Sequence, residues 1–215
     1  MKTFKDFLDH IPKLRHSPLP GLSAQLKMAA MERLEDLQRA TLKKKGAKKA
    51  STMMLIYDKN DLPYFVLIER AKSAGKHSGQ IAFPGGRSEL EDGSHEKTAT
   101  RETWEEIGVA EDQQHVVKAG TPLYIPPSNY MVYPFLAFAK ARPTFTPQKS
   151  EVKKIIEIPL SELFNEQNIS TATLSTTYMK EVSVPCFIFD EIVVWGATAM
   201  MLYEFKILLQ MKDTD

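Results

Sequence analysis

The sequence predicts an α/β protein, a sandwich in which helices pack on a mixed sheet. Short apolar runs at 53–57, 64–68 and 132–139 have the length and composition of buried strands. Two other stretches, 94–107 and 195–211, have the length of helices. These strands and helices do not alternate strictly along the chain, and this irregular order favours a mixed sheet over a doubly wound parallel one.

The N-terminal region is predicted to be partly helical. Apolar residues between Phe4 and Ile11 recur at helical spacing and indicate a short amphipathic helix at 3–11, which Pro12 should end. Residues 22–42 are typical of a helical or partly ordered segment. The basic run KKKGAKK at 43–49 is typical of a solvated linker, and attraction of an anionic ligand is the alternative.

Further elements follow in order along the chain. The runs 53–57 and 64–68, joined by a polar turn, predict a hairpin of buried strands. Ser94 is a suitable N-cap for the helix that Gly108 should end. The remaining predicted strands are at 80–83, 116–124, 132–139, 152–158 and 182–189, with a helical turn at 160–164 and a last helix at 195–211.

Bulk composition excludes several classes of protein. The 215 residues carry 28 Lys and Arg against 27 Asp and Glu, so a net charge of +1 provides no field for nucleic acid or for a membrane surface. A single cysteine cannot form an internal disulfide. The N-terminus has no signal-peptide pattern, and the most apolar stretch, 192–205, is too short to span a membrane. A cytoplasmic location is therefore expected.

The predicted helix at 94–107 carries a stripe of carboxylates. At about 100° per residue, Glu102, Glu105 and Glu106 fall within an arc of about 100° on one face. Thr100, Trp104 and Ile107 lie roughly opposite and are expected to face a core. Three adjacent carboxylates repel one another unless cations neutralise them, and oxygen ligands at this density suit Mg²⁺ or Mn²⁺. A solvated surface helix is the alternative.

Neighbouring residues favour the functional interpretation. Arg101 lies beside the acidic face and could pair with a glutamate or with Asp92. The Gly85-Gly86 pair lets the backbone approach a metal or phosphate closely and leaves a carbonyl free to bind a cation.

Together these residues resemble the Nudix box, G-x5-E-x7-R-E-U-x-E-E-x-G-U, where U is apolar. Gly86 takes the place of the first glycine, Arg101-Glu102 that of the RE pair, Glu105-Glu106 that of the EE pair, and Gly108-Val109 that of the ending. Asp92 stands where the first glutamate is expected, with one extra residue before Arg101, and Thr103 occupies an apolar position.

These departures match a subgroup, the coenzyme A diphosphatases, whose box is similar to GGxxDxxDxxxxxTALREAxEExGL. Here Gly85-Gly86, Glu89, Asp92 and 98–102 have that spacing. Upstream, LIERAKSAGKHSGQIAFPGG at 67–86 resembles the subgroup signature LLTxR[SA]xxxRxxxGxxxFPGG, which it matches at Leu67, Arg70, Ala71, Gly79 and Phe83–Gly86. Gly75 replaces the second arginine of the signature, with Lys72 and Lys76 nearby.

The resemblance implies a Nudix-type α/β/α sandwich and metal-dependent hydrolysis of a nucleoside diphosphate derivative. For coenzyme A or acyl-CoA the products would be 3′,5′-ADP and 4′-phosphopantetheine or its acyl form. Glu102, Glu105 and Glu106 would bind Mg²⁺ or Mn²⁺, assisted by the Gly85 carbonyl. Glu151, in a segment at 150–163 that resembles the source of a further acidic ligand, would be an extra ligand or base.

The remaining roles follow from the same resemblance. Glu102 is the first choice for the general base, and Arg101 would orient the acidic face with Asp92. Gly86, Asp92 and Gly108 would be structural parts of the box. The predicted substrate-binding side chains are Arg70, Lys72, Lys76 and His77. Stacking on adenine by Tyr124, Tyr130 or Tyr133 is an alternative to a place in the core.

Several possibilities stay open at this point. Gly75 keeps open hydrolysis of ADP-ribose, nucleotide sugars, dinucleotides or damaged nucleoside triphosphates, and a non-catalytic nucleotide-binding module is the third reading. The predicted organisation is an N-terminal helical extension and basic linker at 1–49 and a Nudix hydrolase domain at 50–215. The expected partner is a small nucleoside diphosphate derivative, without nucleic acid or membrane. A homodimer is possible, with the N-terminal residues packed across its interface.

Overall fold

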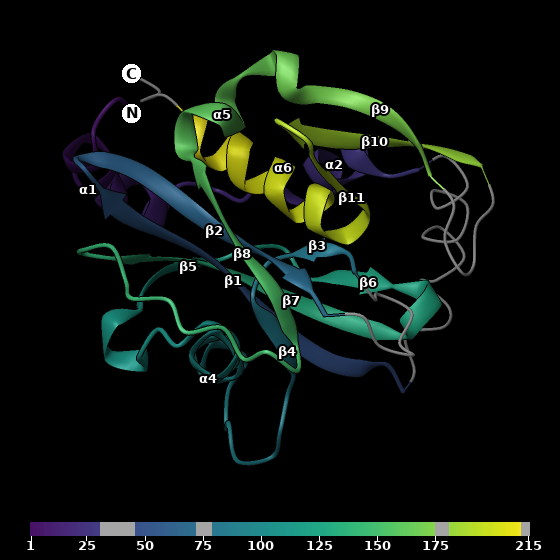
Figure 1. The fold of residues 1–215 in the computed structure, drawn as a ribbon, viewed down its shortest axis with the longest axis horizontal. Coiled ribbons are helices and arrows are strands. Elements are labelled where there is room, and N and C mark those ends of the chain that lie inside the picture. Colours follow the sequence, from purple (N-terminus) through teal and green to yellow (C-terminus); the bar gives the residue numbers. More distant parts are fainter. Residues whose placement is uncertain (31–45, 72–78, 175–180, 212–215) are drawn as a thin grey trace.

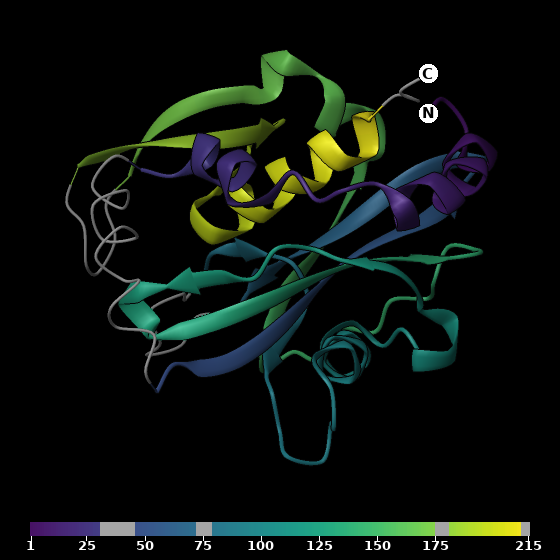
Figure 2. The ribbon, with the colours of Figure 1, turned by 180° about the vertical axis from the view of Figure 1, so that it is seen from behind.

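A large mixed sheet with helices on both faces forms the centre of the structure, a computed structural model that describes residues 1–30, 46–71, 79–174 and 181–211. Figure 1 shows one helix, α4, below this sheet and α6 with the N-terminal helices above it; a small second sheet lies over α6. Figure 2 shows the same layers from behind. The predicted α/β class with a mixed sheet is confirmed, and the small second sheet adds a layer to the expected sandwich.

The elements of these layers have the following bounds. The helices are α1 (Phe4–His16), α2 (Gly21–Gln25), α4 (His95–Ile107), α5 (Leu160–Phe164) and α6 (Gly196–Gln210), with short 3-10 turns at Leu26–Met28, Glu111–Gln113, Pro126–Ser128 and Glu166–Asn168. The strands are β1 (Lys48–Lys59), β2 (Leu62–Arg70), β3 (Ile81–Ala82), β4 (Gly85–Arg87), β5 (His115–Ala119), β6 (Leu123–Ile125), β7 (Tyr130–Ala139), β8 (Val152–Pro159), β9 (Ile169–Leu174), β10 (Val182–Phe189) and β11 (Ile192–Trp195).

Strand β1 organises the large sheet. It pairs in parallel with β7 along its length, and its other edge pairs antiparallel with β4 near Ser51 and with β2 near Ile56. The predicted hairpin is therefore confirmed, with Asn60 and Asp61 at positive φ in its turn. Pairing with β4 places the Gly85-Gly86 segment at the edge of β1, beside the helix that follows it.

Alternate residues of β1 serve two separate cores. Met53, Leu55 and Tyr57 are fully buried in the core between the large sheet and α4. Met54 and Ile56 are fully buried in the larger core, which includes α1, α6 and the second sheet. Because successive side chains of a strand point to opposite faces, a strand buried on both faces is apolar at nearly every position.

Helix α4 begins and ends where its capping residues predict. The Ser94 hydroxyl accepts a hydrogen bond from the Lys97 amide at 3.1 Å. Gly108 ends the helix in the left-handed conformation, at φ 76°. One expectation for this helix is wrong: Trp104 is 52% exposed and does not face a core. Thr100 and Ile107 are buried as expected, and Ala99, Thr103 and Glu106 are buried beside them.

Gly108→Ala is expected to destabilise the protein by about 1–3 kcal/mol, because it adds a Cβ at positive φ and 2.8 Å from the Thr146 Cβ. Chemical denaturation would measure the loss. Gly93→Ala is the matched control: Gly93 also has positive φ, at 68°, but open space around its Cβ position. Equal losses in the two variants would show that backbone strain alone, and not the contact with Thr146, matters at Gly108.

The N-terminal helix packs into the larger core. Phe4, Phe7, Ile11 and Leu14 are buried there, so the apolar face of α1 is covered within its own chain. The predicted end of this helix at residue 11 is wrong, because α1 continues through Pro12 to His16. Burial of Leu14, on the same face, compensates for the hydrogen bond that proline cannot make.

The buried carboxylate of Glu204 holds α2 against α6. Glu204 of α6 is fully buried and accepts hydrogen bonds from the Gly21 amide at 3.1 Å and the Gln25 side chain at 2.8 Å. The Thr121 hydroxyl and amide also donate to Glu204, at 2.5 and 3.2 Å. These four donors satisfy both oxygens of the buried side chain. They link α2, α6 and the turn between β5 and β6.

Other expectations need correction or lie outside the described residues. The predicted strand at 116–124 is two strands, because Gly120 and Thr121 turn the chain toward Glu204. Lys48 and Lys49 of the predicted linker belong to β1, while 31–45 lies outside the described residues. Strands β4, β9 and β11 were not expected. Within the described ranges, no helix is long and apolar enough to cross a membrane.

Candidate active site

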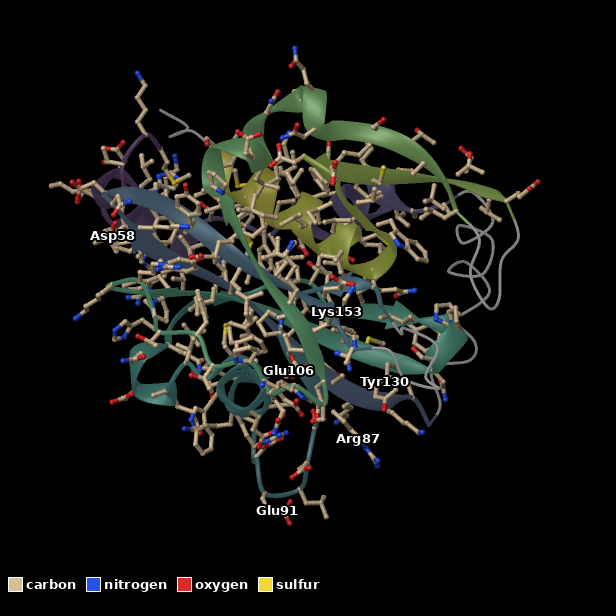
Figure 3. The ribbon with its side chains drawn as sticks, in the orientation of Figure 1. Asp58, Arg87, Glu91, Glu106, Tyr130 and Lys153 are labelled. Atoms are coloured by element: carbon tan, nitrogen blue, oxygen red, sulfur yellow. The ribbon has the colours of Figure 1, made fainter. Side chains whose placement is uncertain are left out.

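Two of the three predicted glutamates on α4 face the sheet. The Glu106 and Glu102 side chains are only 2% and 12% exposed, whereas Glu105 is 49% exposed. Figure 3 shows Glu106 where α4 meets the sheet. The structure therefore brings the predicted carboxylates together on one side of α4, with Glu105 at its solvent-facing border.

Glu106 is held on both of its oxygens. Its Oε2 accepts a hydrogen bond from the Gly85 amide at 2.8 Å, and its Oε1 lies 3.3 Å from Nη1 of Arg70. Burial raises the pKa of Glu106 to about 7, although the Gly85 amide and Arg70 lower it. The negative charges of Glu102 and Glu151 raise this pKa further.

Glu102 lies against the second glycine of the pair. A Cβ on Gly86 would be 2.3 Å from Glu102 Oε2, so only glycine leaves room for this carboxylate. Burial raises the pKa of Glu102, and the neighbouring Arg101 guanidinium opposes that shift. The first glycine is also required: Gly85 has φ of 150°, and a Cβ there would be 2.3 Å from the Ser51 carbonyl oxygen.

Gly86→Ala is therefore expected to displace the Glu102 carboxylate and weaken Mn²⁺ binding by about tenfold or more. Gly86 does not have positive φ, so its backbone tolerates alanine, and the thermal midpoint should fall little. Electron paramagnetic resonance of free Mn²⁺ would measure the affinity. Unchanged affinity in a folded Gly86→Ala protein would exclude Glu102 from the cation site.

Arg101 connects the acidic face to the loop before α4. It makes a bidentate pair with Asp92, with Nε–Oδ1 at 2.6 Å and Nη2–Oδ2 at 3.0 Å, and also donates to the Arg87 carbonyl at 3.0 Å. Its Nη1 lies 3.1 Å from Glu102 and 2.9 Å from Glu105. Both partners considered for Arg101, a glutamate and Asp92, are thus in contact with it.

Asp92 holds Arg101 from the loop between β4 and α4. The Arg101 guanidinium holds the pKa of Asp92 well below its usual range, and Asp92 is 5% exposed. It also accepts hydrogen bonds from the Glu89 amide and the Thr98 hydroxyl. The aspartate is therefore ionised at all ordinary pH values and fixes both the loop and the guanidinium.

Glu151 approaches the same carboxylates from a different element. It immediately precedes β8, and its carbonyl accepts a hydrogen bond from the Ala71 amide at 2.7 Å. Its charge raises the pKa of both Glu102 and Glu106. The predicted extra carboxylate therefore lies close enough to join the cluster electrostatically.

Arg70 has a partner that sequence analysis missed. It was predicted to contact substrate, and the structure places it beside Glu106. A register shift in the β2–β8 pairing at Glu69 and Arg70 accompanies this orientation, and no spacing rule predicts such a bulge. The other predicted substrate-binding residues, Lys72, Lys76 and His77, lie outside the described residues, as does Gly75.

The three tyrosines are engaged within the protein. Tyr133 stacks on His95, with ring centroids 3.6 Å apart, and Tyr124 donates a hydrogen bond to Asn129 at 2.9 Å. Tyr130 lies beneath Lys48, 5.9 Å from its Nζ. The Tyr133–His95 stack joins β7 to the start of α4 and was not anticipated from the sequence.

The chemistry of this donor set fits a hard divalent cation. Glu102, Glu105, Glu106 and Glu151 provide oxygen ligands, in excess of the charge of Arg70 and Arg101. In the described part of the chain, however, no three acidic, histidine or cysteine side chains already converge as a cation site. Arg70 contacts Glu106, and Arg101 contacts Glu102 and Glu105, so the two guanidinium groups already pair with these carboxylates.

A carboxylate-lined helix packed on a mixed sheet behind a Gly-Gly strand is an arrangement that suits the binding of a divalent cation and an anionic substrate. The sequence model of the NUDIX domain matches residues 47–176, more than half of the chain. The chain therefore belongs to the Nudix family, and it is a Nudix hydrolase, an enzyme of the diphosphatase class.

Relatives with curated names include two coenzyme A diphosphatases. The chain is 32% identical over 174 residues to the peroxisomal coenzyme A diphosphatase ndx-8 of Caenorhabditis elegans, a match that covers 80% of this chain and 73% of that protein. It is 29% identical to the mitochondrial coenzyme A diphosphatase NUDT8 of Homo sapiens, over 66% of this chain and 60% of that one. An uncharacterized Nudix hydrolase, NudL of Pectobacterium atrosepticum, is 30% identical, over 70% of this chain and 77% of its own length.

Two solved structures align with this chain at low sequence identity. A MutT/nudix family protein from Enterococcus faecalis aligns over 84% of this chain and 68% of its own, with 18% identity and a TM-score of 0.47. The MutT protein from Methanosarcina mazei Go1 aligns over 77% of this chain and 96% of its own, with 13% identity and a TM-score of 0.49.

Proposed function

We propose that this Nudix hydrolase cleaves the diphosphate bond of coenzyme A or acyl-CoA, giving 3′,5′-ADP and 4′-phosphopantetheine or its acyl form. The observation that carries the proposal is the buried Glu102–Glu106 pair behind Gly85-Gly86, with Arg70 of the coenzyme A signature beside it. The names of the nematode and human relatives support the same substrate class.

In this proposal Glu102, Glu105, Glu106 and Glu151 hold Mg²⁺ or Mn²⁺, and the Gly85 carbonyl assists. The cation, when bound, neutralises the diphosphate and lowers the pKa of water. Arg101, anchored by Asp92, orients Glu102 and Glu105. Glu102 is the proposed general base, and burial raises its pKa above the ordinary carboxylate value, which makes it a stronger base.

The remaining proposals concern the chain around this site. Arg70, Lys72, Lys76 and His77 bind the anionic substrate. The proposed catalytic domain is 50–215, preceded by the extension at 1–49. A cytoplasmic location and a homodimer both stay predictions. Because the apolar face of α1 is covered within its own chain, any dimer contact by the extension would use other residues.

Product analysis by mass spectrometry tests the substrate proposal. The protein would be incubated with Mg²⁺ or Mn²⁺ and coenzyme A, acetyl-CoA, ADP-ribose, a nucleotide sugar, a dinucleotide or oxidised dGTP. Release of 3′,5′-ADP from coenzyme A or acetyl-CoA in preference to the other substrates is expected. Preferred turnover of another diphosphate would reject coenzyme A and attribute the change to Gly75 at the signature arginine position.

Two variants complete this experiment. Glu105→Gln should lose most activity without loss of stability, since its side chain is half exposed. Glu91→Gln, at the tip of the loop between β4 and α4 (Figure 3), changes the same charge away from the carboxylate cluster and should retain activity.

A further inference from the structure

The side chains of Arg70 and Glu106 differ sharply in freedom to move. Glu106 is 2% exposed and is fixed by the Gly85 amide, whereas the Arg70 side chain is 33% exposed. The backbone around Arg70 is held on both sides: the Arg70 amide donates to the Gln80 carbonyl at 3.0 Å, and the Ala71 amide donates to the Glu151 carbonyl at 2.7 Å. The guanidinium can therefore leave Glu106 by side-chain rotation alone.

A cation on Glu106 would compete with this guanidinium. A divalent ion binds a carboxylate oxygen at about 2.1–2.4 Å. Arg70 Nη1 is 3.3 Å from Glu106 Oε1, so an ion on the same oxygen would lie at most about 6 Å from that nitrogen. Two positive groups so close repel each other in a partly buried site. Cation binding at Glu106 and retention of the Arg70 contact therefore oppose each other.

We propose that Arg70 is a displaceable counter-cation: it neutralises Glu106 in the metal-free protein, and the divalent cation displaces it toward the diphosphate of the substrate. This inference rests on the proposed function, because it takes Glu106 to be a cation ligand. The planar guanidinium suits both partners, since it binds carboxylate and phosphate oxygens in a bidentate manner. Arg70 thus contacts first Glu106 and then the diphosphate of the substrate, and it couples cation binding to substrate binding.

Mn²⁺ affinity without substrate tests the first half of the proposal. Free Mn²⁺ would be measured by electron paramagnetic resonance at pH 8.5. Arg70→Met should bind Mn²⁺ about fivefold or more tightly than the wild type, because the competing charge is gone. Arg70→Lys keeps the charge and should remain near the wild type. Arg142→Met, which removes a bidentate pair with Glu157, should not change the affinity.

Affinity for a diphosphate tests the second half. With Mn²⁺ saturating, methylenediphosphonate should bind Arg70→Met about tenfold more weakly than the wild type, measured by calorimetry. Equal or weaker Mn²⁺ affinity in Arg70→Met would overturn the role as counter-cation. Unchanged diphosphonate affinity would overturn the transfer to substrate. Thermal melts of each variant confirm folding, and Arg70→Gln replaces Arg70→Met if the methionine variant does not fold.

Glu106→Gln separates failure of the inference from failure of the proposed function. Loss of Mn²⁺ binding in Glu106→Gln, with Arg70→Met equal to the wild type, would retain the metal site and reject the counter-cation. Absence of Mn²⁺ binding in both the wild type and Arg70→Met would reject both proposals.

Discussion

Glu106→Gln is expected to stabilise the metal-free protein by about 2–3 kcal/mol at pH 8 while abolishing most of its turnover. Burial raises the pKa of Glu106 from about 4.5 to about 7, so the folded state holds a proton that the unfolded chain releases. The stability that this proton contributes is complete below pH 4.5 and is lost as the pH rises through 7. Glutamine is never ionised and avoids that loss.

The quantity to measure is the difference in the free energy of unfolding between the wild type and Glu106→Gln. Urea denaturation of both at pH 5 and pH 8, with a chelator present, cancels the titration of all other groups. The stability gain should be several times larger at pH 8 than at pH 5. Added Mn²⁺ should then stabilise the wild type and have little effect on Glu106→Gln. An equal difference at both pH values would show that Glu106 does not carry the raised pKa.

Arg101→Met is expected to lower the free energy of unfolding by about 2–4 kcal/mol and turnover by about 100-fold or more. Asp92 is 5% exposed and would keep its charge without its bidentate partner. The variant also loses the bond to the Arg87 carbonyl and the contacts that orient Glu102 and Glu105. Stability and activity should therefore fall together.

A double-mutant cycle with Asp92→Asn identifies the source of this effect. If the unpaired aspartate is responsible, Asp92→Asn/Arg101→Met should be more stable than Arg101→Met alone. Lys97→Met removes a pair between α4 and Glu111 of the following 3-10 turn, whose side chains are 65% and 37% exposed, and it should change stability by less than about 1 kcal/mol. Similar losses in Lys97→Met and Arg101→Met would indicate general helix electrostatics.

The sequence correctly predicted the helices and strands that are determined by residues close together in the chain. The hairpin of β1 and β2 follows from apolar runs around a polar turn, and Ser94 and Gly108 mark the ends of α4. The prediction that Trp104 faces a core was wrong, because a helix packed on a sheet buries only the side chains that the sheet contacts. Strand β4 was missed because its glycines have no strand preference; it exists through pairing with β1.

The candidate site likewise contains features that the sequence predicted and others that depend on contacts between distant residues. Helical periodicity placed Glu102, Glu105 and Glu106 on one face, and charge complementarity suggested the Arg101–Asp92 pair. The contact between Arg70 and Glu106 joins residues 36 positions apart, and it coincides with a register shift in the β2–β8 pairing that local sequence patterns do not predict. The different exposure of Glu105 and Glu106, neighbours in sequence, likewise depends on where β4 lies.

The Glu204 cluster has a consequence for synthesis of the chain on the ribosome. Gly21 is synthesised before Glu204, its hydrogen-bond acceptor, which lies 183 residues later in the chain. The sheet face formed by Met54, Ile56 and their neighbours is likewise covered by α6, the last helix in the described chain. The nascent protein therefore leaves that apolar face uncovered until α6 has been synthesised, and completion of the larger core must wait for this helix.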